Sequence, residues 1–101
     1  MAIRYFLPIM SKLTVGSIVR PTAGKEAGKY YVILSAEDEY VYLSDGRRRK
    51  AELPKKKKLK HVAASGFADE YILQKLAHGS KVTNKEVRRA ISDYLKRIDN
   101  N

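Results

Sequence analysis

Short runs of β-prone residues, separated by turn residues, occupy residues 13–62. The runs with strand character are 17–20, 30–35, 40–44, 47–53 and 59–62. So many short strands with tight connections predict a small five-stranded β-barrel, because closing the sheet removes the edges that so short a sheet would expose. We therefore expect a mostly β fold in this part of the chain.

Two connections carry specific turn signals. Asp45-Gly46 lies between two strand-like runs and favours a two-residue type I′ hairpin turn, with 47–53 as the return strand. Residues 22–29 form a loop in which Gly24 and Gly28 permit positive φ or close approach of another backbone. The lysine run 55–58 is expected to be an extended loop between the last two strands.

The hydrophobic period changes after residue 62. Residues 63–66 read as a linker, and 67–77 as a short helix. Thr83 and Glu86 have capping-box spacing. A single apolar stripe then follows at helical spacing, made of Val87, Ala90, Ile91, Tyr94, Leu95 and Ile98. The sequence thus predicts a domain at 13–63 followed by a helical appendage at 64–101, whose two short helices pack together or on the barrel.

Residues 1–12 are expected to be an N-terminal extension outside the fold. The apolar stretch at the start is short and Pro8 interrupts it, so it does not resemble a signal peptide. Met10-Ser11 looks like an ordinary start, which makes residues 1–9 a candidate upstream extension. The sequence has no Cys, which excludes disulfides and Cys-ligated metal sites and fits a reducing compartment.

The positive charge of the chain is concentrated between residues 47 and 60. This segment has nine basic residues and one acid, a local charge of +8 out of +10 for the chain. The basic residues are Arg47, Arg48, Arg49, Lys50, Lys55, Lys56, Lys57, Lys58 and Lys60. A polyanion would relieve their repulsion and release counterions on binding. The alternative interpretation is a solvated segment that only aids solubility.

Catalytic and metal-binding patterns are weak. His61 and His78 lack ligand-type neighbours at metal spacing. The loop 24–29 has its glycines too close for a phosphate-binding P-loop, and no Ser or Thr follows its lysine. We therefore expect a protein that is not an enzyme and has no cofactor. The tyrosines at positions 30, 31, 40 and 42 could stack unpaired bases, but half-buried core positions are the more common role.

Four segments, in order, resemble the KOW motif: VGSIV (15–19), TAGKEAGKYYVI (22–33), SDG (44–46) and PKKKKLKHV (54–62). Residues 14–62 as a whole are similar to KOW-domain RNA-binding proteins related to an archaeal and eukaryotic large-subunit ribosomal protein. Short stand-alone members also occur in bacteria.

The resemblance implies an SH3-like β-barrel that binds ribosomal or other structured RNA. Gly28 matches the central glycine of the motif, and Lys25, Lys29 and the run Lys55–Lys60 match its basic contact positions. One departure concerns Arg48, because relatives often have an apolar residue there. If Arg48 pointed inward, the strand would need a bulge or the barrel would be locally open.

The leading hypothesis is a cytoplasmic, ribosome-associated RNA-binding protein that is monomeric outside its complex and does not bind membranes. The second is a protein-interaction module of the transcription or translation machinery, in which the C-terminal helices dock a partner. The third is a non-specific binder of DNA or anionic membranes.

Overall fold

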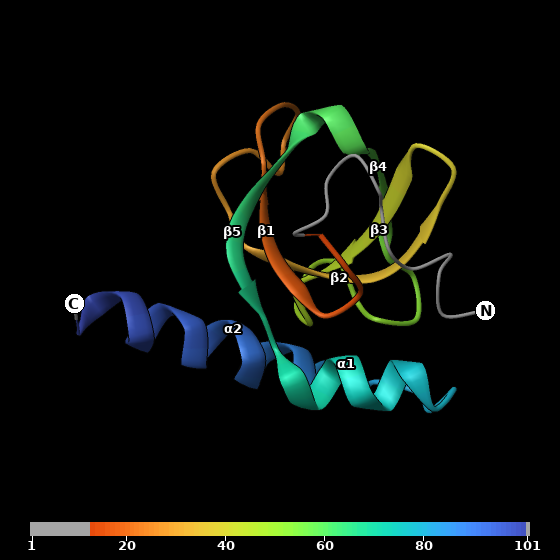
Figure 1. Ribbon diagram of the computed structural model, residues 1–101. Coiled ribbons are helices and arrows are strands. Elements are labelled where there is room, and N and C mark those ends of the chain that lie inside the picture. Colours follow the sequence, from red (N-terminus) through yellow and green to blue (C-terminus); the bar gives the residue numbers. More distant parts are fainter. Residues whose placement is uncertain (1–12, 101) are drawn as a thin grey trace.

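The computed structural model describes residues 13–100, and the predicted extension 1–12 lies outside the described residues. Five strands precede two helices (Figure 1). The elements are β1 (Ser17–Pro21), β2 (Tyr31–Glu37), β3 (Tyr40–Ser44), β4 (Lys55–Lys58), the 3₁₀ helix η3 (Leu59–His61), β5 (Val62–Ala68), α1 (Glu70–Ala77) and α2 (Asn84–Asp99). A mostly β fold followed by two C-terminal helices is thereby confirmed.

The five strands form one antiparallel sheet in the order β4-β3-β2-β1-β5. β4 and β5 are its two edges and do not pair with each other, so the sheet is not closed. The short helix η3 links these edges directly, and the sheet curves around an interior (Figure 1). A hydrogen bond from the Thr22 N–H to the His61 carbonyl, 2.9 Å, ties the end of β1 to η3.

The predicted two-residue turn at Asp45-Gly46 is wrong. Residues 45–54 form a long loop, and β3 pairs instead with the lysine run, with Leu43 opposite Lys55 and Tyr40 opposite Lys58. Asp45 Oδ1 accepts hydrogen bonds from the backbone N–H groups of residues 47 and 49, both at 2.9 Å, which curls the chain into the loop. The predicted strand 47–53 is therefore replaced by loop.

The lysine run 55–58, expected to be a loop, is strand β4, and the predicted strand 59–62 is η3 followed by the first residue of β5. β5 continues through 63–66, the predicted linker, and pairs with β1 from Pro21–Val62 to Ser17–Ala68. It crosses the domain boundary expected after residue 63. The first helix starts at Glu70 rather than at residue 67, because Asp69 caps it by accepting a bond from the Ile72 N–H at 3.0 Å.

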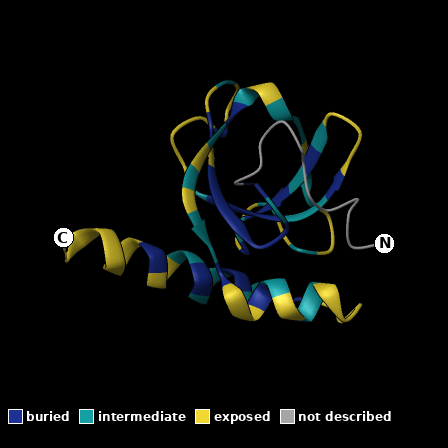
Figure 2. Ribbon diagram, viewed as in Figure 1, coloured by how far each residue is buried: buried dark blue, intermediate teal, exposed yellow. Residues whose placement is uncertain are grey.

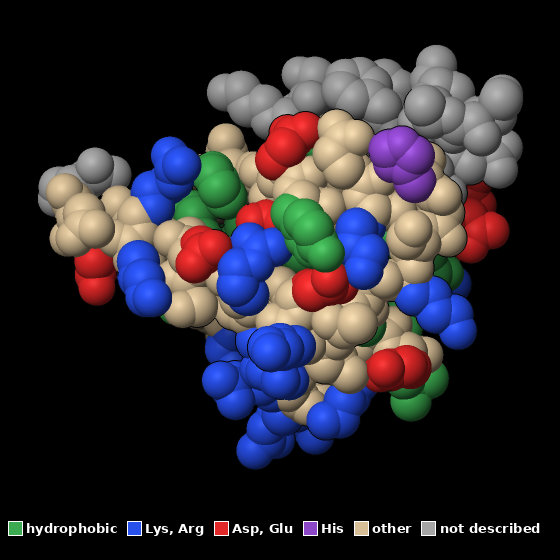
Figure 3. Space-filling view, turned by 90° about the horizontal axis from the view of Figure 1, so that it is seen from below, with side chains coloured by type: hydrophobic (Ala, Val, Ile, Leu, Met, Phe, Trp, Pro, Cys, Tyr) green, Lys and Arg blue, Asp and Glu red, His purple; other side chains and the backbone are tan. Residues whose placement is uncertain are grey.

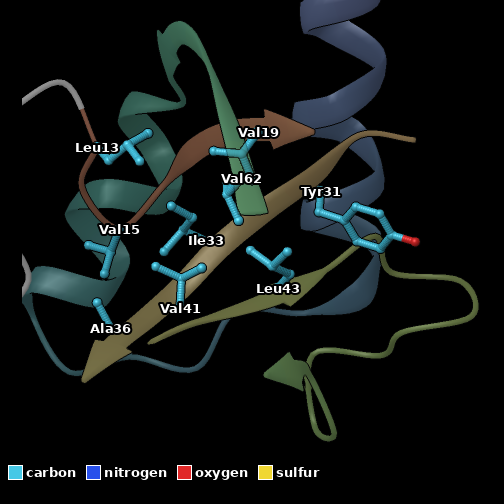
Figure 4. Close-up of a cluster of buried hydrophobic side chains, with 9 residues drawn as sticks. All are labelled: Leu13, Val15, Val19, Tyr31, Ile33, Ala36, Val41, Leu43 and Val62. Carbon is cyan, nitrogen blue, oxygen red and sulfur yellow. The ribbon is translucent and has the colours of Figure 1, made fainter. Parts of the chain in front are cut away.

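One hydrophobic core fills the concave side of the sheet (Figure 4). Alternate residues of neighbouring strands supply it, as the period of two in a strand requires. Its buried members are Leu13, Val15, Val19, Tyr31, Ile33, Ala36, Val41, Leu43 and Val62. This core explains the β-prone composition of β1, β2 and β3.

A second core lies between the outer side of β1 and β2 and the helices. Ile18 and Val32 from the sheet pack with Ile72 of α1 and with Val87 and Tyr94 of α2. The helices therefore share a core with the sheet.

The stripe on α2 begins at the predicted capping box, which is present with both reciprocal bonds between Thr83 and Glu86. The stripe is buried in its first half, whereas the C-terminal end of the helix is exposed (Figure 2). The sheet thus covers only part of the apolar face that the sequence predicts.

Two glycines let the starts of the helices lie close to the backbone next to the sheet, just before β1 and just after β3. At Gly16, which has φ +87°, a Cβ atom would lie 3.2 Å from the Asp69 carbonyl oxygen at the start of α1. At Gly46, which has φ +73°, a Cβ atom would lie 2.5 Å from the Asn84 carbonyl oxygen at the start of α2. Gly46 thus serves a contact between segments distant in sequence rather than a hairpin turn.

None of the helices among residues 13–100 is long and apolar enough to cross a membrane.

Replacing Gly46 with Ala tests the close contact between Gly46 and the start of α2. The substitution combines an unfavourable positive φ with a backbone clash, so we expect a loss of about 3 kcal/mol in the free energy of unfolding. Gly79→Ala is the matched control, because Gly79 has φ +77° but no atom within 4 Å of the position that a Cβ would take. It should cost only about 1 kcal/mol. Equal losses in urea denaturation would contradict the close packing of α2 at Gly46.

Candidate nucleic-acid interface

Two loops carry most of the predicted RNA-binding residues. We name residues 22–29 the glycine loop and residues 45–54 the basic loop. The glycine loop joins β1 to β2, and the basic loop joins β3 to β4. They are separated in sequence by two strands, so their proximity has to come from tertiary contacts.

The carboxylate of Glu26 makes these contacts. Its Oε2 accepts a hydrogen bond from Arg49 Nη2 of the basic loop at 2.9 Å, and its Oε1 accepts one from Lys57 Nζ of β4 at 3.1 Å. Lys57 Nζ also donates to the Ala23 carbonyl oxygen at 3.0 Å. Only 6% of Glu26 is exposed, so a single buried carboxylate ties together the glycine loop, the basic loop and the edge strand.

Burial of Glu26 by itself would raise the pKa of its carboxyl group, since burial disfavours the charged form. The hydrogen bonds from Arg49 and Lys57 outweigh burial and lower the pKa from 4.5 to about 2. Glu26 is therefore ionised at neutral pH. Gly24 makes room for the arrangement, because a Cβ atom there would lie 2.7 Å from Lys57 Nζ.

The predicted site residues divide into two groups. Arg49 and Lys57 are both ion-paired with Glu26; only 12% of the Lys57 side chain is exposed, whereas 39% of the Arg49 side chain is. Lys55 and Lys58 are half-buried. The remaining predicted residues are exposed: Lys25, Gly28, Lys29, Arg47, Arg48, Lys50, Lys56 and Lys60. Arg48 lies in the basic loop, so the expected conflict of an inward-pointing arginine does not arise.

The lysines of β4 alternate between the two faces of the sheet. Lys55 and Lys57 are paired with the core residues Leu43 and Val41. Lys56 and Lys58 are paired with tyrosines of β3 and lie on the opposite face. The four consecutive lysines are therefore not equivalent, although the sequence shows no difference between them.

The glycine loop is ordered by its own backbone. The Gly28 N–H donates to the Pro21 carbonyl at 3.1 Å, and the Lys29 N–H donates to the Glu26 carbonyl at 3.2 Å. Gly28 has φ +82° and no atom within 4 Å of the position that a Cβ would take. Its outer side is therefore open to a partner, with Lys25 and Lys29 exposed on the same loop.

Helix α2 holds the basic loop in place, through residues that sequence analysis missed. Asn84 Oδ1 accepts a bond from the Ala51 N–H at 2.7 Å, and Arg88 Nη1 donates to the Gly46 carbonyl at 2.7 Å. Both residues are polar and lie on or beside the apolar stripe of α2. Their position at this stripe is the only sequence signal that could have identified them. Arg47, Arg88 and Lys96 line one hollow between the loop and the helix.

Charged side chains are unevenly distributed over the surface that carries the helices (Figure 3). Seen from the side of the helices, acidic and basic side chains are interspersed across the middle of the face, whereas Lys and Arg side chains crowd together at its lower edge (Figure 3).

Within residues 13–100, no three His, Asp or Glu side chains are grouped so that they could hold a metal ion.

Replacing Glu26 with Gln should lower the free energy of unfolding by about 2 kcal/mol at pH 7, because Arg49 and Lys57 lose their anionic partner. Glu39→Gln, at an exposed position, is the control and should change stability by no more than about 0.5 kcal/mol. Urea denaturation measures both. A neutral effect of Glu26→Gln would show that the carboxylate does not stabilise the two loops.

The low pKa of Glu26 also predicts a pH dependence. Its stabilising contribution is present above the unfolded-state pKa of about 4.5 and is lost as the pH falls towards about 2. Glu86 behaves in the same way, because hydrogen bonds from the backbone of Thr83 and from Tyr71 and Lys75 lower its pKa to about 2. Thermal unfolding should show a falling midpoint over this range. The fall in the midpoint should be smaller in Glu26→Gln than in the wild type. An identical fall would contradict the assignment of this pH dependence to Glu26.

In comparisons with known proteins, the sequence matches no protein-family model and no curated protein.

Proposed function

We propose that this protein is a non-catalytic RNA-binding protein with a KOW-type, SH3-like barrel. Its partner would be structured RNA, with ribosomal RNA as the leading candidate, in the cytoplasm and in association with the ribosome. The observation that carries the proposal is the Glu26 cluster. It holds the glycine loop and the basic loop together and leaves their other cations facing solvent.

The charge arrangement supports a polyanionic partner. Glu26 neutralises part of the charge of Arg49 and Lys57, but no salt bridge is formed by Arg47, Arg48, Lys50 or the glycine-loop lysines within residues 13–100. A cluster of solvated cations on an ordered backbone repels itself, and phosphates relieve that repulsion. Duplex RNA presents phosphates and shape rather than readable base edges in its deep major groove, so such a site would recognise mainly shape.

The observed fold is compatible with the proposed KOW-type, SH3-like barrel. Its sheet curves around a hydrophobic interior, and η3 connects the two edge strands. The open outer side of Gly28 is compatible with the role that the KOW resemblance implies, which is close approach of the loop to a partner backbone.

The salt dependence of binding tests the role of the basic loop. Arg48→Gln with Lys50→Gln should weaken binding to a structured RNA and reduce the log–log salt slope by about 1.5, because two phosphate contacts are lost. Both residues are exposed in a loop, so the free energy of unfolding should change by less than about 0.5 kcal/mol for each.

The matched control is Lys81→Gln with Lys85→Gln, which removes the same charge from exposed positions outside both loops. This variant should keep the wild-type slope. An equal loss in both variants would mean that net charge alone determines binding, and the assignment to the basic loop would fail.

Ribosome association is tested separately by sedimenting cell extract at low and high salt. Co-migration with ribosomal particles that is lost at high salt supports the proposal. Migration as a free small protein at low salt would move the target to another RNA.

A protein-interaction module is the second candidate. The observation in its favour is the exposed end of the apolar stripe on α2, where Leu95 is 39% and Ile98 is 40% exposed. Ribonuclease treatment of the native complex separates the two, because a complex held by protein contacts survives the digestion of RNA.

A further inference from the structure

The outer face of β3 and β4 carries two tyrosines and two lysines next to one another. Tyr40 and Tyr42 occupy alternate positions of β3 and therefore point to the same face. Their partners across the ladder are Lys58 and Lys56, respectively. Both residues are half-buried, and neither belongs to the two hydrophobic cores of the described residues.

Other tyrosines of the strand region have structural roles. Tyr31 is 3% exposed in the concave core. Tyr30 packs against Tyr94 of α2, with ring centroids 5.4 Å apart, and its hydroxyl accepts a long bond from Arg20 at 3.4 Å. Tyr40 and Tyr42 are the pair for which the packing of the described chain provides no such explanation.

Lysine and tyrosine are already in contact on this face. Lys56 Nζ lies 4.3 Å from the centroid of the Tyr40 ring, in a cation–π contact. Lys56 is exposed, so its ammonium group can leave the ring for a phosphate while an aromatic base takes its place. Within residues 13–100, the Tyr42 hydroxyl makes a single hydrogen bond, a long one of 3.4 Å to Glu37 Oε1.

We infer that this face, which we name the tyrosine platform (Tyr40, Tyr42, Lys56 and Lys58), stacks unpaired nucleotides of the bound RNA. The inference rests on the proposed RNA binding and specifies its substrate: an RNA with single-stranded nucleotides as well as a folded part. Residues two apart in a strand lie roughly 7 Å apart along it, so the rings offer successive stacking positions to an extended strand. Lys56 and Lys58 then contact the adjacent phosphates.

The opposing explanation is that the lysines only protect an edge strand. β4 is an edge of the sheet, and lysines there discourage pairing with another chain. Edge protection requires the charge of the lysines but not the aromatic rings of β3. Removing the rings while keeping the lysines therefore separates the two explanations.

The experiment compares two probes, a short oligouridine and a blunt RNA duplex with the same number of phosphates. Tyr40→Ala with Tyr42→Ala should weaken oligouridine binding roughly ten-fold or more. Binding to the duplex, which has no unpaired bases, should be unchanged. The salt slope should stay the same on both probes, because no phosphate contact is removed.

Two control variants accompany this test. Tyr40→Phe with Tyr42→Phe keeps both rings and should retain oligouridine binding. Tyr71→Ala removes a tyrosine that is 51% exposed on α1, away from the sheet, and should bind both probes as the wild type does. Thermal unfolding of each variant checks that the fold is retained.

A second readout uses the wild-type protein alone. An oligonucleotide carrying the fluorescent base 2-aminopurine should be quenched on binding, because stacking on an aromatic ring quenches this fluorophore. No quenching would overturn the inference, even if the double alanine variant failed to fold.

The outcomes separate this inference from the proposed function. Unchanged oligouridine affinity in the double alanine variant, or an equal loss on both probes, overturns the platform but leaves RNA binding in place. If the wild type binds neither probe, or binds them without a steep salt dependence, RNA binding itself is overturned, and the platform with it.

Discussion

The ion-pair cluster around Glu26 determines how the basic residues of this protein can be used. Without an internal anion, the cations of the basic loop and of β4 would repel one another and hold the loop away from the edge strand. Glu26 is buried and accepts hydrogen bonds from both Arg49 and Lys57, so it joins segments that lie 23 and 31 residues away in the sequence. The same contact ties the basic loop to the glycine loop, which carries Lys25 and Lys29. Two cations are thereby used for structure, and the others stay available to a partner.

The helices complete this framework from the other side of the sheet. Asn84 and Arg88 hold the backbone of the basic loop, and the absence of a side chain at Gly46 lets α2 lie directly on it. The loop is therefore fixed at one side by Glu26 and at the other by α2. Such preorganisation lowers the conformational entropy that a partner would otherwise have to remove on binding. The C-terminal region thus has a structural role in the candidate interface.

The elements that could be predicted from the sequence are those whose signals are local. β1, β2 and β3 follow runs of β-prone residues, and α2 follows a capping box and an apolar stripe. Most of the secondary-structure predictions for residues 45–68 are wrong. At Asp45-Gly46 a local turn signal is overridden by the contact with α2, and four lysines give no indication of a strand because their pairing depends on β3 and on Glu26. The sequence also gives no indication that Arg49 and Lys57 are ion-paired within the fold, because Glu26 looks like a single acid in a glycine-containing loop.

The strand geometry of β4 distinguishes four lysines that look equivalent in the sequence. Because successive side chains of β4 point to opposite faces, Lys57 reaches the buried carboxylate while its neighbour Lys56 lies over the ring of Tyr40. A loop with the same composition would place all four ammonium groups in solvent, where they would be interchangeable. In the strand, a shift of the register by one residue would move Lys57 away from Glu26 and Lys56 away from the tyrosines at once. The internal ion pair therefore also fixes which lysines belong to the tyrosine platform, so the stability of the fold and the composition of the proposed RNA-binding surface depend on the same strand register.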